Sequence, residues 1–413
     1  MKRQFFPQRV NYPVFLEKIG FNYWNWVSGP NKLPYWQEGV AYGFSETKVD
    51  LILNATQELH NMSIEMVGRM VKSGDYPDYF ALDKHSIPLI EQSWKRQDKS
   101  LYGRFDLVFD GQDQIKMLEY NGDTPVSILE CAVAQWHYTE FLVDNGHLPE
   151  SCRIQYNLID ENLIELWQSM YAPNTLIHFL ASADFRHEDW GNLSYIMDTA
   201  FRAGMRVKDL TMQEIGHDAN TGHFVDNELQ EMKHVFKLYP WEWMTHEDYG
   251  KHILGSTTQW LEPAWKMLLS NKAMLVKLWE LFPNHPLLLE SYSEKGFEKV
   301  LYGQWAKKAI HGREGSNIYK IIREGGINLE EDLAQGSHRV PDYDQWGYMY
   351  QKWHNLPIID NTHPIIGSWV IGDKASGMSI REDANLVTGN DSFFASHFYV
   401  PYEEEQRLKH LYE

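Results

Sequence analysis

Apolar residues in the first quarter of the chain recur at close to the 3.6-residue period of an α-helix. The clearest run follows Ser45-Glu46-Thr47, and its apolar positions are Val49, Ile52, Leu53, Leu59, Ile64, Val67 and Met70. Residues 13–100 are therefore predicted to be mainly helical. From residue 101 to 121 the period changes to two, which is typical of strands. A further helix is expected from Val126 to Leu142.

The middle of the chain shows a β-α-β order. Residues 175–182 have the composition of a buried strand, a helix is expected around 190–203, ending at Gly204, and residues 206–210 fit the next strand. Strands that alternate with helices usually form a parallel sheet. A small parallel-sheet subdomain is therefore predicted near residues 173–240.

The last third of the chain is rich in glycine. A helix is expected from Pro263 to about Phe282, because proline is favoured at the first helical position. From residue 287 onward, short strands are separated by glycines and loops. The whole pattern indicates an α+β fold with many loops, which often carry functional sites.

Composition and charge exclude several classes of protein. The 413 residues carry a net charge of −19 and show no lysine or arginine tract, so the chain is not expected to bind nucleic acid. Two cysteines, Cys131 and Cys152, cannot form a disulfide framework. The sequence has no apolar run of the length of a membrane span. A cytoplasmic protein without a membrane partner is expected, and its oligomeric state is left open.

The common nucleotide and nucleophile motifs are absent. The sequence contains no P-loop pattern, no G-x-G and no G-x-S-x-G. A P-loop NTPase, a Rossmann dehydrogenase and an α/β-hydrolase are therefore not expected.

One predicted hairpin carries a polar face. Strands at 103–110 and 115–121 flank four turn-like residues, and this loop length would place Asp106 opposite Glu119 and Arg104 opposite Asn121. On the other face, Phe105 and Leu107 would meet Tyr120 and Leu118.

The opposed carboxylates of this hairpin repel each other unless a cation lies between them. A hard divalent ion with oxygen ligands would relieve the repulsion, and Asn121 offers a third oxygen. The alternative is an ordinary solvated polar face on an edge hairpin.

A second polar segment, residues 307–317, combines cations with glycine. Lys308 and Arg313 lie among Gly312 and Gly315, so charge and exposed backbone N–H groups could together hold an anion. An exposed turn would have the same composition. Taken with the hairpin, the loop favours a nucleoside triphosphate bound with Mg²⁺ without a P-loop.

Several of these segments together resemble the synthetase domain of glutathionylspermidine synthase. They are Gly103-Arg104-Phe105-Asp106, Leu118 to Pro125, Gly312 to Asn317, Gly367 to Val370 and Gly377 to Asp383. The resemblance covers nearly the whole chain and is closest to stand-alone relatives that lack the amidase half. It implies a permuted ATP-grasp fold of the glutathionylspermidine-synthetase type, with the βαβ unit as a pre-ATP-grasp-like subdomain.

The resemblance implies one synthetase unit over residues 1–413. Its parts would be a mainly helical segment (about 1–100), a metal-binding hairpin with helices (101–172), the βαβ subdomain (173–255) and the nucleotide-binding lobes (256–413). It also implies ATP-dependent amide formation, in which a carboxylate becomes an acyl phosphate that an amine then attacks.

The resemblance also assigns roles to individual residues. Two Mg²⁺ ions would be held by Asp106, Glu119 and Asn121, and the catalytic arginines would be Arg104, Arg313 and Arg381. ATP would be bound by Arg104, Asp106, Lys272, Lys308, Glu314, Gly315, Gln351, Lys352, Trp353 and His354, and by a strand formed by Leu386, Val387 and Thr388.

On the substrate side, Thr124 would contact a peptide-like carboxylate substrate, and Glu188 and Asp189 would contact an amine such as a polyamine. Pro240 stands where the family has a threonine that contacts glutathione, so the resemblance names neither substrate. Two alternatives stay open. The chain could be a non-catalytic ATP-grasp relative that binds nucleotide or peptide, or a phosphotransferase that stops at the phosphorylated carboxylate.

Overall fold

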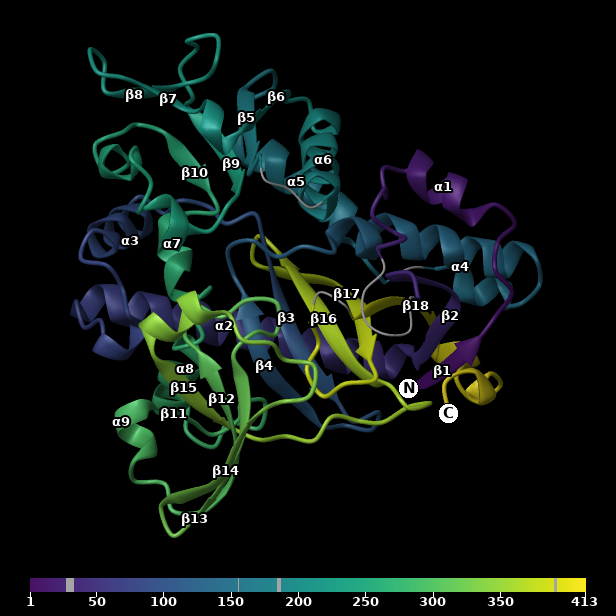
Figure 1. Ribbon diagram of the computed structural model, residues 1–413. Coiled ribbons are helices and arrows are strands. Elements are labelled where there is room, and N and C mark those ends of the chain that lie inside the picture. Colours follow the sequence, from purple (N-terminus) through teal and green to yellow (C-terminus); the bar gives the residue numbers. More distant parts are fainter. Residues whose placement is uncertain (27–32, 155, 184–186, 390–391) are drawn as a thin grey trace.

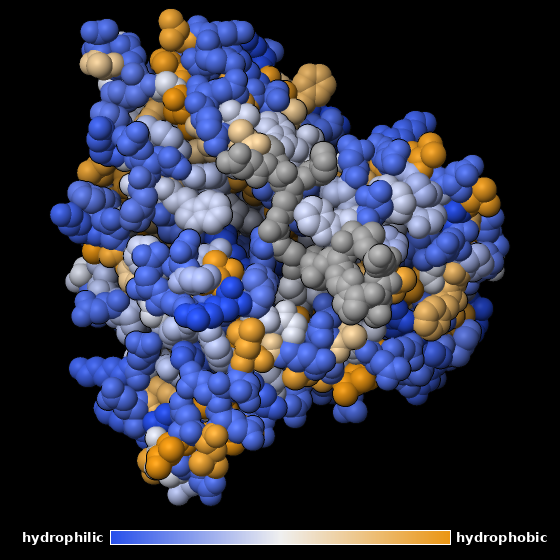
Figure 2. Space-filling model, in the orientation of Figure 1, coloured by the Kyte–Doolittle hydropathy of each residue, from blue (hydrophilic) through white to orange (hydrophobic). Residues whose placement is uncertain are grey.

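The computed structural model describes residues 1–26, 33–154, 156–183, 187–389 and 392–413. It has three main β-sheets with helices packed around them (Figure 1). The two termini lie side by side, and Lys2 Nζ donates to the His410 carbonyl oxygen at 2.7 Å. The face shown in Figure 2 is largely hydrophilic, with apolar residues scattered over it.

The α-helices are mostly short. Their bounds are α1 (Tyr12–Lys18), α2 (Glu46–Ser73), α3 (Ser86–Lys95), α4 (Gln135–Asp144), α5 (Ile159–Met170), α6 (His187–Arg202), α7 (Trp241–Met244), α8 (Met274–Leu281) and α9 (Glu294–Phe297). Within the described residues, none is both long and apolar enough to cross a membrane.

The largest sheet has seven strands. Its order is β1 (Lys2–Phe5), β2 (Trp36–Ser45), β18 (Phe393–Val400), β17 (Lys374–Asp383), β16 (His363–Ile371), β3 (Tyr102–Phe109) and β4 (Ile115–Asn121). Neighbouring strands are antiparallel except β18 and β2, which are parallel. The chain thus brings its first and last segments into one sheet.

Both faces of this sheet are buried. Along β16, Ile366 and Val370 belong to one hydrophobic core, whereas Trp369 and Ile371 belong to another. Strand β2 was not predicted, because a strand buried on both faces has no polar alternation to reveal it. The expectation of a mainly helical 13–100 segment is otherwise met by α1, α2 and α3.

The predicted start of the long helix is confirmed. Ser45 caps α2, its side chain accepting from the Lys48 N–H at 3.4 Å, and Gly74 ends the helix with φ +66°.

A four-stranded parallel sheet contains the expected β-α-β unit. Its order is β10 (Gln259–Leu261), β9 (His234–Leu238), β5 (Leu176–Ala181) and β6 (Arg206–Thr211), and α6 connects β5 to β6. The strands predicted at 175–182 and 206–210 are therefore confirmed. A two-stranded ribbon, β7 (Gly216–Asp218) with β8 (His223–Val225), follows β6.

The third sheet is antiparallel and has five strands. Its order is β11 (Ser291–Ser293), β15 (Tyr348–Lys352), β12 (Gly303–Ala309), β13 (Ile318–Glu324) and β14 (Ile327–Leu333). The glycine-rich last third thus forms short strands, as predicted.

Two predicted helices differ in detail. The segment after Pro263 is a 3₁₀ turn (Ala264–Leu268) separated from α8, because Asn271 bonds the backbone of Ala273 and of Phe80 at 2.9 and 2.6 Å. The helix expected at 126–142 starts near residue 128 and contains a π-helical turn, Glu130–Ala134, before α4.

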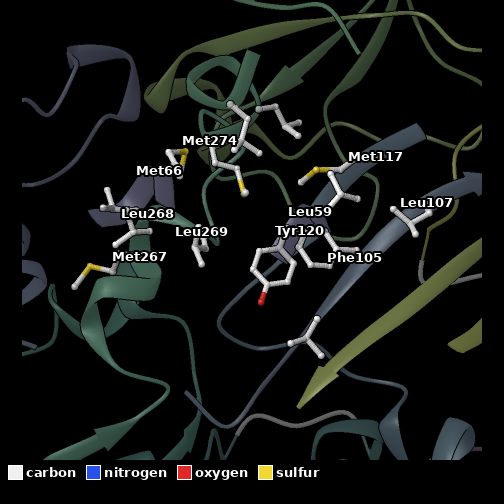
Figure 3. Packing of buried hydrophobic residues seen from close by; sticks show 14 of the residues in the cluster. Leu59, Met66, Phe105, Leu107, Met117, Tyr120, Met267, Leu268, Leu269 and Met274 are labelled. Atoms are coloured by element: carbon white, nitrogen blue, oxygen red, sulfur yellow. The ribbon is translucent and has the colours of Figure 1, made fainter. Parts of the chain in front are cut away.

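The apolar face of the β3–β4 hairpin is packed in the core. Phe105 and Tyr120 stack with ring centroids 4.0 Å apart, beside leucine and methionine side chains such as Leu269 and Met274 (Figure 3). With this face buried, alternating residues of the hairpin must face the opposite side, where the site lies.

Candidate active site

The register of the β3–β4 hairpin agrees with the prediction where the polar residues lie. Arg104 pairs with Asn121, and Asp106 pairs with Glu119. The prediction that Leu107 faces Leu118 is wrong: a β-bulge after Asp106 pairs Leu107 with Met117 instead. The bulge adds one residue on one strand, and alternation alone does not reveal this.

The polar face continues across neighbouring strands. Strand β16 pairs Gly367 with Asp106, and β17 pairs Ser379 with Gly367. A side chain at Gly367 would place its Cβ 3.0 Å from Arg104 Cδ and 2.6 Å from Ser379 Oγ. Glycine here leaves the space that the Arg104 side chain occupies.

Arg104 is held rigidly. Its Nε and Nη2 donate to Asp106 at 2.7 and 3.1 Å, and its Nη1 donates to the Val126 carbonyl oxygen at 2.7 Å. Its exposed fraction is 7%. A buried guanidinium fixed in this way is a preorganised positive charge.

Glu119 lies between two lysines. Lys272 Nζ is 2.9 Å from Glu119 Oε2, and Lys308 adds a second nearby charge. Burial alone would raise the pKa of Glu119, but these ammonium groups hold it at about 2. Burial lowers the pKa of Lys308 to about 8. Glu119 is therefore a carboxylate throughout the neutral range.

One cavity of about 580 Å³ collects most of the predicted site residues. Those lining it are Arg104, Asp106, Glu119, Asn121, Thr124, Glu188, Asp189, Arg313, Glu314, Gly315, Arg381 and Thr388. They are spread over residues 104–388, so the fold brings together side chains that are far apart in the sequence. Lys272 lines an adjoining small cavity together with Glu119 and Arg313.

The glycine-rich loop packs over this cavity. Arg313 Nη1 donates to Thr124 Oγ1 at 3.0 Å, and its Nε donates to Glu242 Oε1 at 3.2 Å. Gly315 has φ +70°, and a Cβ there would lie 2.6 Å from the Thr388 carbonyl oxygen. Residues 386–388 therefore form a loop against Gly315, and the predicted strand there is wrong.

Arg381 and Glu188 also line the cavity, and their charges interact. Arg381 Nη2 donates to the Gly389 carbonyl oxygen at 2.5 Å, while its buried Nε has no partner among the described residues. Burial, followed by the charge of Glu130, raises the pKa of Glu188 to about 8. Residues 184–186, which shortly precede Glu188 in the sequence, lie outside the described residues.

The segment Gln351 to His354 does not line the cavity. Gln351 accepts from Lys308 Nζ at 2.8 Å and so adjoins the site, but Lys352 lies over the Trp305 ring. Trp353 donates to Asn355 at 3.2 Å, and His354 is half-buried. Of these four residues, the structure therefore links only Gln351 to Lys308.

Sequence reasoning missed several residues that line the cavity, among them Gln213, Tyr239, Trp243 and Glu247. A buried ion pair fixes this wall: Lys237 Nζ lies 2.7 Å from Asp123 Oδ1, and the other Asp123 oxygen accepts from the Trp241 N–H. In the sequence, only the aromatic residues from Tyr239 to Trp243 indicated that this segment could line a site.

The donor set suits a hard divalent cation. Asp106 and Glu119 supply carboxylate oxygens, and Asn121 donates from Nδ2 to Asp106 at 3.3 Å, which leaves its amide oxygen for a cation. Among the described residues, no group of three or more His, Cys, Asp or Glu side chains forms a metal cage. A cation here would therefore depend on oxygens of a ligand, as Mg²⁺ does with phosphates.

Comparison with known proteins gives a consistent result. The family model described as glutathionylspermidine synthase preATP-grasp matches residues 3–400. A Haemophilus influenzae protein named "Putative acid–amine ligase" is 42% identical over 398 residues, which cover 96% of this chain and 98% of that protein.

More distant relatives are longer than the matched region. A trypanothione synthetase of Crithidia fasciculata is 27% identical, with 82% of this chain matching 53% of its length. The bifunctional glutathionylspermidine synthetase/amidase of Escherichia coli is 25% identical, with 85% of this chain matching 58% of its length.

Among solved structures, a glutathione synthetase-like effector from Globodera pallida matches with a TM-score of 0.56 and 12% identity. The match covers 94% of this chain and 98% of that one. This likeness supports the mixed α/β fold.

Proposed function

The chain belongs to the glutathionylspermidine synthase preATP-grasp family, and from that premise we propose that it is an ATP-dependent acid–amine ligase. In this proposal a peptide-like or amino-acid carboxylate reacts with ATP to give an acyl phosphate, and an amine such as a polyamine displaces the phosphate. The permuted ATP-grasp architecture, with residues 173–255 as a pre-ATP-grasp-like subdomain, is part of the proposal.

The observation that supports it best is that cationic and acidic side chains line one cavity. Arg104 and Arg381 line it together with the carboxylates of Glu188 and Asp189. A ligase needs a place for phosphate charge and a place for a cationic amine, and both are available here.

At the phosphate end, Asp106, Glu119 and Asn121 would hold Mg²⁺. When bound, Mg²⁺ would neutralise charge on the phosphate oxygens. Lys272 and Lys308 would bind phosphate directly. The guanidinium of Arg104 would face the charge that develops as the γ-phosphoryl group moves to the substrate carboxylate, because it is already fixed and needs no reorganisation.

The loop that carries Arg313 would close over the reactants. Its contacts with Thr124 and Glu242 join the glycine-rich loop to the segment after β4 and to α7. Exclusion of water matters here, because water would hydrolyse an acyl phosphate before an amine reached it.

The adenine end is proposed from the family resemblance. Gln351 to His354 would form the hinge against the base, and Leu386 to Thr388 and Glu314-Gly315 would complete the nucleotide site. Residues 352–354 would have to move in order to reach a nucleotide.

A non-catalytic nucleotide-binding relative would not need all of the proposed catalytic and metal-binding side chains. Here Arg104, Asp106 and Glu119 keep the hairpin register, and Arg381 faces the same cavity. No feature of the described residues favours a binder over a ligase. A phosphotransferase would not need Glu188 and Asp189 in the cavity.

The test is ADP release by the purified protein with ATP and Mg²⁺, across a panel of peptides and amino acids including glutathione, each with and without spermidine. A ligase gives ADP only when both a carboxylate and an amine are present, and the amide is identified by mass spectrometry. Phosphorylated carboxylate without amide would indicate a phosphotransferase. Nucleotide binding with no turnover for any pair would favour the binder.

A further inference from the structure

A buried carboxylate, Glu130, lies behind the amine end of the site. Its side chain is completely shielded from solvent, and it sits at the start of the π-helical turn. Tyr23 and Tyr35 each donate their hydroxyl to it at 2.9 Å. π-Helical turns often occur at functional sites. A buried carboxylate is costly unless it is hydrogen-bonded or paired.

Glu130 is tied to the first turn of α6, which carries Glu188. Asn192 Nδ2 donates to the Tyr23 hydroxyl at 3.1 Å and to the Glu188 carbonyl oxygen at 2.8 Å. The Asn192 amide oxygen accepts from the Ile128 N–H at 2.8 Å. The π-helical turn and the start of α6 are therefore held in a fixed relation.

The two carboxylates have unequal environments. Glu130 accepts two hydroxyl hydrogen bonds, which favour its charged form, while Glu188 lines the cavity near that charge. Burial raises the pKa of Glu130, and its two hydrogen bonds oppose this rise. The charge of Glu130 in turn disfavours a second negative charge on Glu188, which therefore takes up a proton at higher pH than an ordinary glutamate.

The other charges around Glu188 come from its own helix and from two other segments. Arg381 on β17 favours ionisation of Glu188, whereas Asp189 on α6 and Glu314 on the glycine-rich loop oppose it. The net result is a group that exchanges its proton near neutral pH, which is the condition for an efficient proton acceptor.

We propose that Glu130 is a positioning residue for the amine half of the reaction: by holding a fixed negative charge behind the first turn of α6, it makes Glu188 the group that takes the proton leaving the amine. This inference rests on the ligase function proposed above. The amine enters as R–NH₃⁺, because that is its form at neutral pH, and one proton passes to the Glu188 carboxylate.

The rest of the reaction needs no further side chain. The freed lone pair forms the C–N bond to the carbonyl carbon of the acyl phosphate, and the C–O bond to phosphorus breaks with its electron pair on phosphate. The nitrogen then gives its extra proton to the departing phosphate, and Glu188 later releases its proton to solvent.

The coupling can be tested without any substrate. In protein labelled with ¹³C at the glutamate side-chain carboxyls, we expect a resonance that titrates near pH 8 in the wild type and is absent in Glu188→Gln. In Glu130→Gln it should move to lower pH by at least about one unit. Tyr35→Phe, which removes one donor from Glu130, should move it the same way by less.

The exposed Glu165→Gln serves as the matched control and should leave the resonance in place. A Glu188 midpoint below about pH 5, near that of an ordinary glutamate, overturns the inference. So does a midpoint that is unchanged in both Glu130→Gln and Tyr35→Phe. Tyr35→Phe keeps the test valid if the buried Glu130→Gln variant fails to fold.

Kinetics then separates this inference from the ligase proposal. Hydroxylamine is already neutral at pH 7 and traps acyl phosphates as hydroxamates, so Glu188→Gln should lower amide formation with spermidine at least about tenfold more than it lowers hydroxamate formation. Equal losses with both nucleophiles would contradict the proton-acceptor role. Absence of hydroxamate in the wild type, with every carboxylate of the panel, would instead refute the ligase proposal.

Discussion

Replacing Arg104 with alanine should impair catalysis strongly and also lower the free energy of unfolding. The guanidinium makes two charge-assisted hydrogen bonds to Asp106 and one to the Val126 carbonyl oxygen, all within 3.1 Å. Its positive charge faces the cavity that would hold the transferred phosphoryl group. The substitution removes this charge and leaves Asp106 without its partner.

The two costs differ in size. Loss of one preorganised electrostatic contact costs about 10²–10³ in kcat, equivalent to about 2.7–4 kcal/mol. Loss of each hydrogen bond to a charged group costs about 1.5–3 kcal/mol of folding free energy. We expect the lower end of that range, because the Asp106 side chain is 20% exposed and can be partly solvated.

The assay compares kcat for ADP release with the free energy of unfolding in urea. Arg104→Lys keeps a charge but cannot bind Asp106 through two nitrogens, so its kcat should lie between those of the wild type and Arg104→Ala. Arg407→Ala, at a 64% exposed arginine, should leave both quantities unchanged. A folded Arg104→Ala enzyme with kcat within about threefold of the wild type would refute the role of Arg104.

Four further outcomes are expected. Glu119→Ala should abolish turnover in the ADP-release assay, since it removes the carboxylate shared by the proposed ions. Glu188→Ala should raise KM for the amine, and an unchanged KM would exclude Glu188 from the amine site. Gly315→Ala should raise KM for ATP about tenfold, because its Cβ would collide with backbone, whereas Gly325→Ala, with φ +58° in open space, should not change KM. Burial lowers the pKa of His397 to about 4, so its contribution to the free energy of unfolding should be fully present above about pH 6.5 and be lost as the pH falls toward 4. In His397→Phe, the free energy of unfolding in urea should lose about 3 kcal/mol of its change between these pH values. The same pH dependence in the variant and the wild type would contradict this prediction.

The sequence predicted the metal face of the hairpin because two local rules suffice for it. Alternation fixes which residues share a face, and the short turn fixes the register, so Asp106 and Glu119 could be paired without a structure. The bulge after Asp106 was not predictable from alternation, because Met117 and Leu118 are both apolar and either could face Leu107.

Other parts of the site depend on contacts between distant segments. Arg313 meets Glu242 and Thr124 across separations of 71 and 189 residues, and no local pattern encodes either contact. Burial conceals other features: β2 lacks alternation because both faces are covered. Glu130 resembles any helical glutamate in the sequence, and only the fold places it under two tyrosines.

The central claim is that the carboxylate substrate passes through an acyl phosphate. Its most direct test uses a carboxylate substrate labelled with ¹⁸O at both oxygens, turned over with ATP and amine, with the inorganic phosphate analysed by ³¹P NMR. The account predicts one ¹⁸O in each phosphate released, because a carboxylate oxygen attacks the γ-phosphorus and leaves with it. Amide product with unlabelled phosphate would contradict the account.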